Sequence, residues 1–157
     1  DLIFAIETLC HSKNLIALLN KLTDYITDNG KIIIFDGYIK QGVTLNIEAE
    51  KKAYQLLSWG FALPTFQKLE EVLNRNNLDG LKIDTNTEFS ENVLPNALAF
   101  QRGSLKTLQY HFLIKLLLKT HLISIAYIKQ ISAGLFGAYF LKTGYLGYYK
   151  LELSKKV

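Results

Sequence analysis

Apolar residues form two short uninterrupted runs near the start of the chain, Leu2–Ile6 and 32–35, and each ends in polar residues. Such a run is typical of a strand buried on both faces of a parallel sheet. Between the runs, apolar residues recur at helical spacing, and Ser12 is the expected N-cap. Gly30 is placed to end this helix. The helical positions are Leu15, Leu18, Leu19, Leu22 and Ile26. Strand, helix and strand in this order predict two parallel neighbouring strands joined by a right-handed crossover.

The middle of the chain predicts two helices and a strand. The first helix begins near residue 47, breaks near Gly60 and closes before Pro64. The second begins at Pro64, which suits a first helical turn, and a strand follows over 81–90. The apolar stripe of the second helix is Phe66, Leu69, Val72 and Leu73.

The last third predicts a helical insertion before a final strand. From 91 to 141 the pattern is helical with expected breaks at Pro95, Gly103 and Gly134, and alternation over 144–156 indicates a strand. With 157 residues and 49% hydrophobic residues, the chain can build one sizeable core. We therefore expect a single α/β domain over 1–157, with 91–141 as an insertion.

The net charge and the cysteine content indicate which partners and which cellular compartment to expect for this protein. The net charge of +4 is modest and no basic stripe with interleaved aromatic residues occurs, so we expect no nucleic-acid partner. Cys10 is the lone cysteine, and it can form neither an internal disulfide nor a CxxC zinc site. This favours a reducing compartment, and we expect a cytoplasmic protein without a predicted metal site.

From this sequence we expect neither a signal peptide nor a membrane-spanning helix. Methionine is absent throughout, so we expect the chain to be part of a longer protein. No signal-peptide pattern is visible. Lysines interrupt the most apolar segment before it reaches the roughly 18 uncharged residues of a membrane-spanning helix, which is not expected here.

Four stretches carry a family resemblance: "AIETLCHSKN", "NGKIIIFDGY", "LEEVLNRNNLDGLKI" and "YYKLELSKK". Together they resemble the second half of a class I S-adenosylmethionine-dependent methyltransferase of the methyltransferase type 11 group. Glu7 to His11 is similar to the E-A-T-C-H segment of sterol methyltransferases, with Thr8 and Leu9 differing. The resemblance implies a partial Rossmann-like sheet made of strands four to seven, with the last strand antiparallel. It also implies S-adenosylmethionine as cofactor, although the glycine-rich turn that grips it in the family is absent from this sequence.

Polar residues follow both early strands, at the edge where an open α/β sheet binds ligands. On the first strand, the resemblance places Ile6, Glu7 and Thr8 at the cofactor. His11 is the candidate general base, and Glu7 could orient it or hold the acceptor. The alternative for both is a helix start that satisfies backbone donors. Cys10 is expected to be a small buried apolar residue rather than a nucleophile.

Three further residues are candidates for binding the acceptor. Asp36 and Tyr38 end the second strand, and the competing interpretation is a turn, for which Asp-Gly is a common signal. Trp59 belongs either to a lid or to the core.

The helical insertion allows several interpretations. On one continuous helix, His111, Lys115, Lys119 and Lys129 gather on one side. It is either a core helix with a solvated lysine face, a lid over a hydrophobic acceptor, or a contact with a membrane surface.

Two functions of different kinds follow. The first is methyl transfer by the full-length protein to a small acceptor, for which a hydrophobic molecule is one option. The alternative is a non-catalytic half-fold that associates with another chain, or with a second copy, through the exposed edge of its first strand.

Overall fold

The computed structural model describes residues 1–156, except for the side chain of Arg75. The chain forms two compact units. The sheet unit comprises residues 1–43, 66–90 and 145 onward, and the helical unit comprises 44–65 and 91–144. The predicted insertion at 91–141 falls in the helical unit, together with a segment from earlier in the chain.

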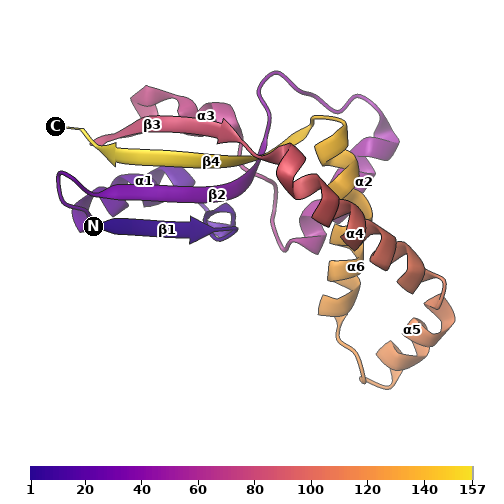
Figure 1. Cartoon of the computed structure of the whole chain (residues 1–157). Coiled ribbons are helices and arrows are strands. Elements are labelled where there is room, and N and C mark those ends of the chain that lie inside the picture. Colours follow the sequence, from indigo (N-terminus) through magenta and orange to yellow (C-terminus); the bar gives the residue numbers. More distant parts are fainter. Residues whose placement is uncertain (157) are drawn as a thin grey trace. The chain divides into compact units, whose positions relative to one another are not determined.

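The sheet unit contains four strands in the spatial order β1 (Leu2–Ile6), β2 (Lys31–Ile39), β4 (Leu146–Lys155) and β3 (Leu81–Glu88) (Figure 1). β1 is parallel to β2, whereas β4 is antiparallel to both β2 and β3. This confirms an α/β sheet whose last strand is antiparallel. It also places the carboxyl ends of β1, β2 and β3 at one edge of the sheet.

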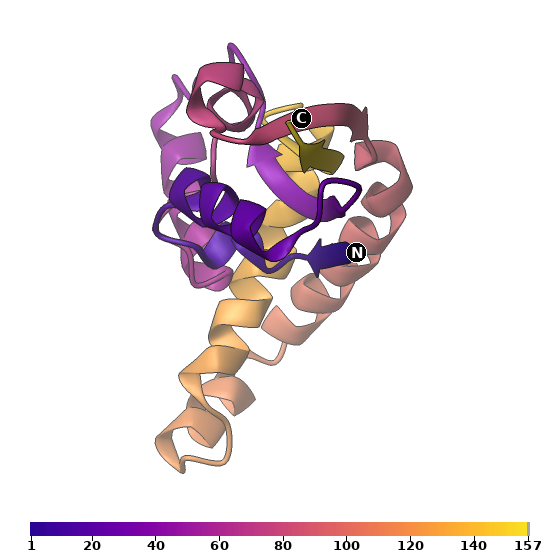
Figure 2. The same ribbon diagram turned by 90° about the vertical axis from the view of Figure 1, so that its left-hand side faces the viewer.

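Helices α1 (Leu15–Leu22) and α3 (Leu69–Leu73) cover the same face of this sheet (Figures 1 and 2). Short 3-10 helices flank them: η1 (Leu9–His11), η2 (Thr23–Tyr25) and η3 (Arg75–Asn77). Because strand side chains alternate between faces, every second residue of β2 and β4 joins the core beneath the helices. The central members of this core are Leu15, Leu19, Ile32, Ile34, Val72, Leu151 and Leu153.

Two local predictions for α1 and α3 are wrong. The N-cap of α1 is Asn14, whose side chain accepts a hydrogen bond from the Ala17 backbone N–H at 2.9 Å, and not Ser12. The turn of η1 occupies the preceding residues, so the helix begins later. α3 begins at Leu69, and Phe66 is buried ahead of the helix rather than on its stripe.

β1 is not buried on both faces, contrary to the sequence prediction. Only Ile3 and Ala5 pack against the core, whereas Leu2, Phe4 and Ile6 are 61%, 55% and 52% exposed. Leu2, Phe4 and Ile6 are exposed because β1 lies at the edge of the sheet and α1 and α3 cover only its other face. A continuous apolar run therefore indicated a strand correctly but overstated its burial.

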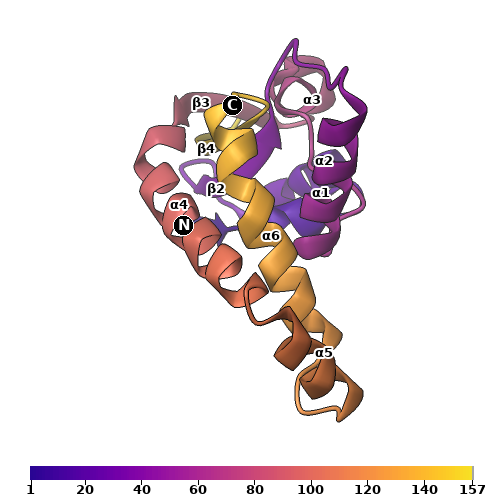
Figure 3. The same ribbon diagram turned by 90° about the vertical axis from the view of Figure 1, so that its right-hand side faces the viewer.

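The helical unit consists of α2 (Glu48–Gly60), α4 (Ser90–Leu108, from Glu91 on), α5 (His111–Lys119) and α6 (Ile125–Lys142). α4 and α6 run side by side, and α5 connects them at one end (Figure 3). Within residues 1–156, none of the helices has the length and apolar character required to cross a membrane.

The predicted helix breaks in this unit are misplaced. Helices continue through Pro95, Gly103 and Gly134, and the chain breaks instead at 109–110 and 120–124. The segment is therefore not one continuous helix. Gly134 provides close packing: a Cβ atom there would lie 2.1 Å from the Ser104 hydroxyl of α4.

Candidate functional site

Glu7 ends β1 in an uncommon backbone conformation. Its φ of 47° lies in the left-handed region, which costs a residue with a side chain roughly 1–3 kcal/mol and is seen most often at functional sites. The Glu7 backbone N–H donates to the Phe35 carbonyl at 2.8 Å, and the Tyr148 hydroxyl donates to Glu7 Oε1 at 3.2 Å. These bonds from β2 and β4 hold the strained residue in place.

Asp36 lies on β2 beside the loop that follows β1. Its carboxylate is buried and accepts hydrogen bonds from the backbone N–H groups of Cys10, at 2.8 Å, and of Gly37, at 2.9 Å. Burial raises the pKa of the Asp36 carboxyl above its usual value. The competing interpretation, an Asp-Gly turn, is wrong, because both residues continue β2.

Burial also raises the pKa values of two groups near Asp36, the Cys10 thiol and the Tyr148 hydroxyl. It raises the pKa of the Cys10 thiol to about 12, and the negative charge of Asp36 adds to this effect. A thiol with this pKa stays protonated near neutral pH and is a poor nucleophile. Burial and the carboxylate of Glu7 together raise the pKa of the Tyr148 hydroxyl, which therefore acts as a hydrogen-bond donor.

Tyr38 lies inside the core of the sheet unit. Its side chain is 1% exposed, and its ring packs edge to face against Tyr149 with the centroids 6.2 Å apart. Its hydroxyl has no hydrogen-bond partner among the described residues. Asp36 and Tyr38, predicted as acceptor-binding residues, thus lie together on the helix-covered face and are not open to solvent.

The remaining candidates at the end of β1 are exposed. The Thr8 hydroxyl donates to the Ile6 carbonyl at 2.6 Å, and the His11 backbone N–H donates to the Thr8 carbonyl at 3.3 Å. The imidazole of His11 and the side chains of Ile6 and Glu7 are all open to solvent. The structure therefore brings Glu7 and His11 to the carboxyl edge of the sheet, as predicted, while their chemical roles stay predictions.

Trp59 lies in the helical unit, near the end of α2. The ammonium group of Lys129 lies 5.4 Å from the centre of its ring, which is a cation–π distance. Its predicted contact with the acceptor stays a prediction.

A second polar group, not predicted from the sequence, lies at this edge around Glu88 at the end of β3. The Glu88 carboxylate pairs with Lys40 at 2.5 Å and accepts hydrogen bonds from Ser90 at 2.6 Å and Tyr149 at 3.3 Å. Burial alone would raise its pKa, but the hydrogen bond from Lys40 holds the pKa of Glu88 below its usual value. The sequence indicated a strand over 144–156, but it carries no signal that pairs Tyr148 with Glu7 or Tyr149 with Glu88.

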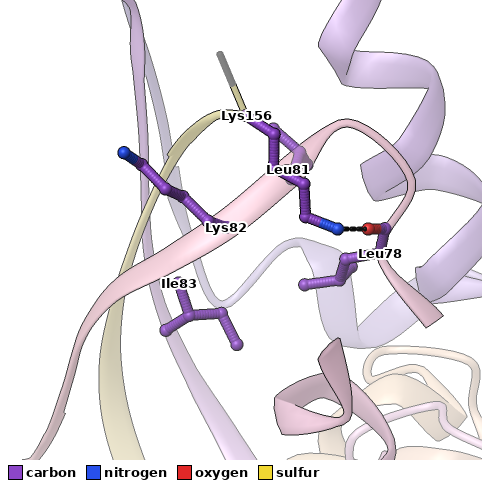
Figure 4. A pocket seen from close by; sticks show the side chains of 5 residues that line it. All are labelled: Leu78, Leu81, Lys82, Ile83 and Lys156. Atoms are coloured by element: carbon purple, nitrogen blue, oxygen red, sulfur yellow. Dashed lines mark hydrogen bonds between the residues drawn. The ribbon is translucent and has the colours of Figure 1, made fainter. Parts of the chain in front are cut away.

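A surface hollow lies at the opposite edge, at the amino end of β3 (Figure 4). The Lys156 ammonium group donates to the Leu78 carbonyl at 2.6 Å across it. The lining residues are Leu78, Leu81, Lys82, Ile83 and Lys156. They include no carboxylate, thiol or imidazole, so the hollow offers no acid–base or nucleophilic chemistry. Among residues 1–156, no three His, Cys, Asp or Glu side chains come together as a metal site.

Comparisons with known proteins identify the fold through structure rather than sequence. No family model matches the chain, and no curated protein does. The cyclopropane synthase MmaA2 from Mycobacterium tuberculosis superposes with a TM-score of 0.70 at 10% identity, over 99% of this chain and 55% of its own. Mycolic acid cyclopropane synthase CmaA1, complexed with SAH and CTAB, superposes with a TM-score of 0.74 at 9% sequence identity. The match covers 99% of this chain and 55% of the CmaA1 chain.

A third solved structure is geranyl diphosphate C-methyltransferase from Streptomyces coelicolor A3(2), in complex with Mg2+, geranyl diphosphate and S-adenosyl-L-homocysteine. It gives a TM-score of 0.63 at 11% identity, over 99% of this chain and 48% of its own. The chain spans about half the length of these solved structures. Over that length, it has the fold of the S-adenosylmethionine-dependent methyltransferases.

Proposed function

We propose that this chain is part of a methyltransferase that moves a methyl group from S-adenosylmethionine to a small acceptor. The observation that carries the proposal is the strained, hydrogen-bonded Glu7 beside the exposed His11, at the carboxyl edge of a sheet with the methyltransferase fold. In an open α/β sheet, this edge is where ligands bind.

The exposed residues at this edge fit part of the cofactor. S-adenosylmethionine, when bound, supplies a methyl group on a positively charged sulfur. The carboxylate of Glu7 suits the positive charges of such a ligand, and the Ile6 side chain offers an apolar surface for its aromatic base. Thr8 is exposed beside them. Because the glycine-rich turn of the family is absent from this sequence, we expect the chain by itself to bind the cofactor weakly.

The same edge supplies the groups that an acceptor needs. His11 takes the proton that the acceptor loses when it gains the methyl group, and Glu7 orients the acceptor. Asp36 acts as a positioning residue, because its carboxylate holds the backbone of Cys10 next to His11.

The proposal is tested with the full-length protein that contains this chain. Incubation with isotope-labelled cofactor and pools of small molecules and lipids should transfer label to an acceptor, and calorimetry should detect cofactor binding. Absence of both transfer and binding would contradict the proposal.

A second candidate function is association through β1, and the two edges of the sheet favour it. At one edge, β3 is irregular between Ile83 and Thr85 and carries polar residues, and both features discourage pairing with another strand. At the other edge, β1 is regular and exposes Leu2, Phe4 and Ile6. An unprotected apolar edge is suited to pairing with another strand, either of the remaining protein or of a second copy.

Light scattering after size-exclusion chromatography tests this alternative. The 157-residue chain should self-associate, and Phe4→Lys should shift it toward the monomer, whereas Tyr25→Lys, at an exposed site away from the edge, should not. A stable wild-type monomer would remove the argument for association.

A further inference from the structure

Exposed apolar side chains gather where α5 joins its neighbours, in residues 109–125, here called the tip. Phe112 is 77% exposed and Leu122 is 73% exposed. The other large apolar side chains exposed at the tip are Tyr110, Leu113, Leu116 and Ile125. Single exposed apolar residues are common on proteins, but several of them on one short segment indicate an interaction site.

The burial pattern of α5 shows which face points outward. Ile114 is buried, so it marks the inner face of the helix. At about 100° per residue, Phe112 and Leu116 lie on the opposite side, flanked by Lys115 and Lys119. All four of these side chains are exposed. The outward face of α5 therefore combines an aromatic ring, an aliphatic side chain and two ammonium groups.

Charge is distributed unevenly along the chain. Residues 92–144 contain no Asp or Glu. The basic residues in this stretch are Arg102, Lys106, Lys115, Lys119, Lys129 and Lys142. Because the whole chain has a net charge of only +4, the rest of the chain is net negative. The apolar tip thus belongs to a segment that carries positive charge alone.

We propose that the tip docks on an anionic membrane surface. A helix with exposed aromatic and aliphatic residues beside lysines inserts its apolar side chains at the boundary between headgroups and acyl chains. The stems of Lys115 and Lys119 extend along the apolar layer and place their ammonium groups among lipid phosphates and carboxylates. The six positive charges of residues 92–144 add a longer-range attraction to acidic lipids. This interaction does not depend on methyl transfer and requires no spanning helix.

Vesicle flotation with the full-length protein tests the proposal. The protein should float with vesicles of phosphatidylcholine and phosphatidylserine, but not with vesicles of phosphatidylcholine alone, and added salt should weaken binding. Lys115→Gln with Lys119→Gln should lower the partition coefficient by at least about tenfold. Lys51→Gln with Lys52→Gln, at exposed positions of α2, is the charge-matched control and should leave binding unchanged.

A second measurement reports insertion directly. The variant Phe112→Trp, made together with Trp59→Phe, carries a tryptophan at the tip. On anionic vesicles the emission of this tryptophan should shift to the blue, and brominated lipids should quench it. Phe112→Ser with Leu116→Ser should abolish flotation, whereas Tyr25→Ser, at an exposed site of the sheet unit, should not. Equal flotation of the tip variants and wild type would overturn the proposal. So would a dimer that forms without lipid and is lost in the Phe112→Ser variant, because a second copy would then cover the tip.

Discussion

The backbone N–H of Cys10 donates a 2.8 Å hydrogen bond to the buried Oδ2 of Asp36, 26 residues away in the chain. This bond ties the loop after β1 to the neighbouring strand β2. Because Asp36 is shielded from water, the bond meets little competition from solvent. The loop that presents Glu7 and His11 therefore depends on a residue that does not itself reach the solvent.

Asp36→Asn should destabilise the protein by about 1–3 kcal/mol at neutral pH. The variant replaces one of two accepting oxygens with an NH₂ group, which then faces a backbone N–H of Cys10 or Gly37. Urea unfolding measures the loss, and Asp24→Asn, at an exposed site in η2, is the control. Equal stability of wild type and Asp36→Asn would show that these two hydrogen bonds contribute no net stability.

The stability of wild type relative to Asp36→Asn should depend on pH. Burial raises the pKa of Asp36 in the folded state, so the folded protein binds this proton more tightly than the unfolded chain does. The resulting contribution to stability is fully present below the unfolded pKa and is lost as pH rises through the folded pKa. Urea unfolding over an acidic pH series should therefore show the difference between the two proteins shrinking as pH rises. A difference that grew with pH would mean that the folded pKa is lowered.

Tyr38→Phe should raise stability by about 1 kcal/mol, because it removes a buried hydroxyl that has no partner among the described residues. Thermal and urea unfolding measure this change, with Tyr25→Phe as an exposed control. Turnover by the full-length Tyr38→Phe variant shows whether Tyr38 only packs in the core or also contacts the acceptor. Unchanged turnover supports a packing role, whereas a large loss would support the predicted contact with the acceptor.

His11→Ala and Glu7→Gln should each reduce methyl transfer by the full-length protein by roughly 10² or more. Cofactor affinity should fall much less, even when Glu7 loses its charge, because the family's main grip on the cofactor is the glycine-rich turn, which this sequence does not contain. Glu7→Gln removes the charge but keeps an oxygen that can accept the hydrogen bond from Tyr148. Turnover and calorimetry provide the two readouts. Lys13→Ala and Glu70→Gln, at exposed positions, are the matched controls. Wild-type turnover in both site variants, with normal circular dichroism, would assign the segment after β1 to a structural role.

Gly60→Ala should destabilise the helical unit by at least about 2 kcal/mol, as overpacking against rigid atoms does. A Cβ atom at Gly60 would lie 2.6 Å from the Ala133 backbone nitrogen and 2.8 Å from the Lys129 carbonyl, so α2 and α6 would have to separate. Gly103→Ala is the matched control: a Cβ atom there meets nothing within 4 Å, and the variant should be neutral or slightly stabilising. Circular dichroism during thermal unfolding distinguishes the two variants, and equal melting temperatures would contradict the expected clash.

Local periodicity in the sequence was enough to predict the order of elements. Alternating or continuous apolar runs and helical spacing are properties of neighbouring residues, so β1, β2 and β4 were predicted close to their observed positions. The helix after β1 was predicted too long, because α1 ends at Leu22 and not near Gly30. The antiparallel last strand came from the resemblance to methyltransferases, since periodicity does not report strand direction. The edge position of Glu7 and His11 followed from the rule that polar residues at the carboxyl ends of parallel strands lie together.

By itself, then, the sequence determined which segments form strands and helices, because those choices depend on side chains within a few residues of one another. Only the tertiary structure decided that β1 exposes one apolar face, that Pro95 is accommodated within α4, and that Asp36 and Tyr38 are buried. It alone paired Tyr148 with Glu7, 141 residues apart. Burial and such contacts depend on which strands become neighbours and on which layer covers each face, and no short-range pattern in the chain records either of them.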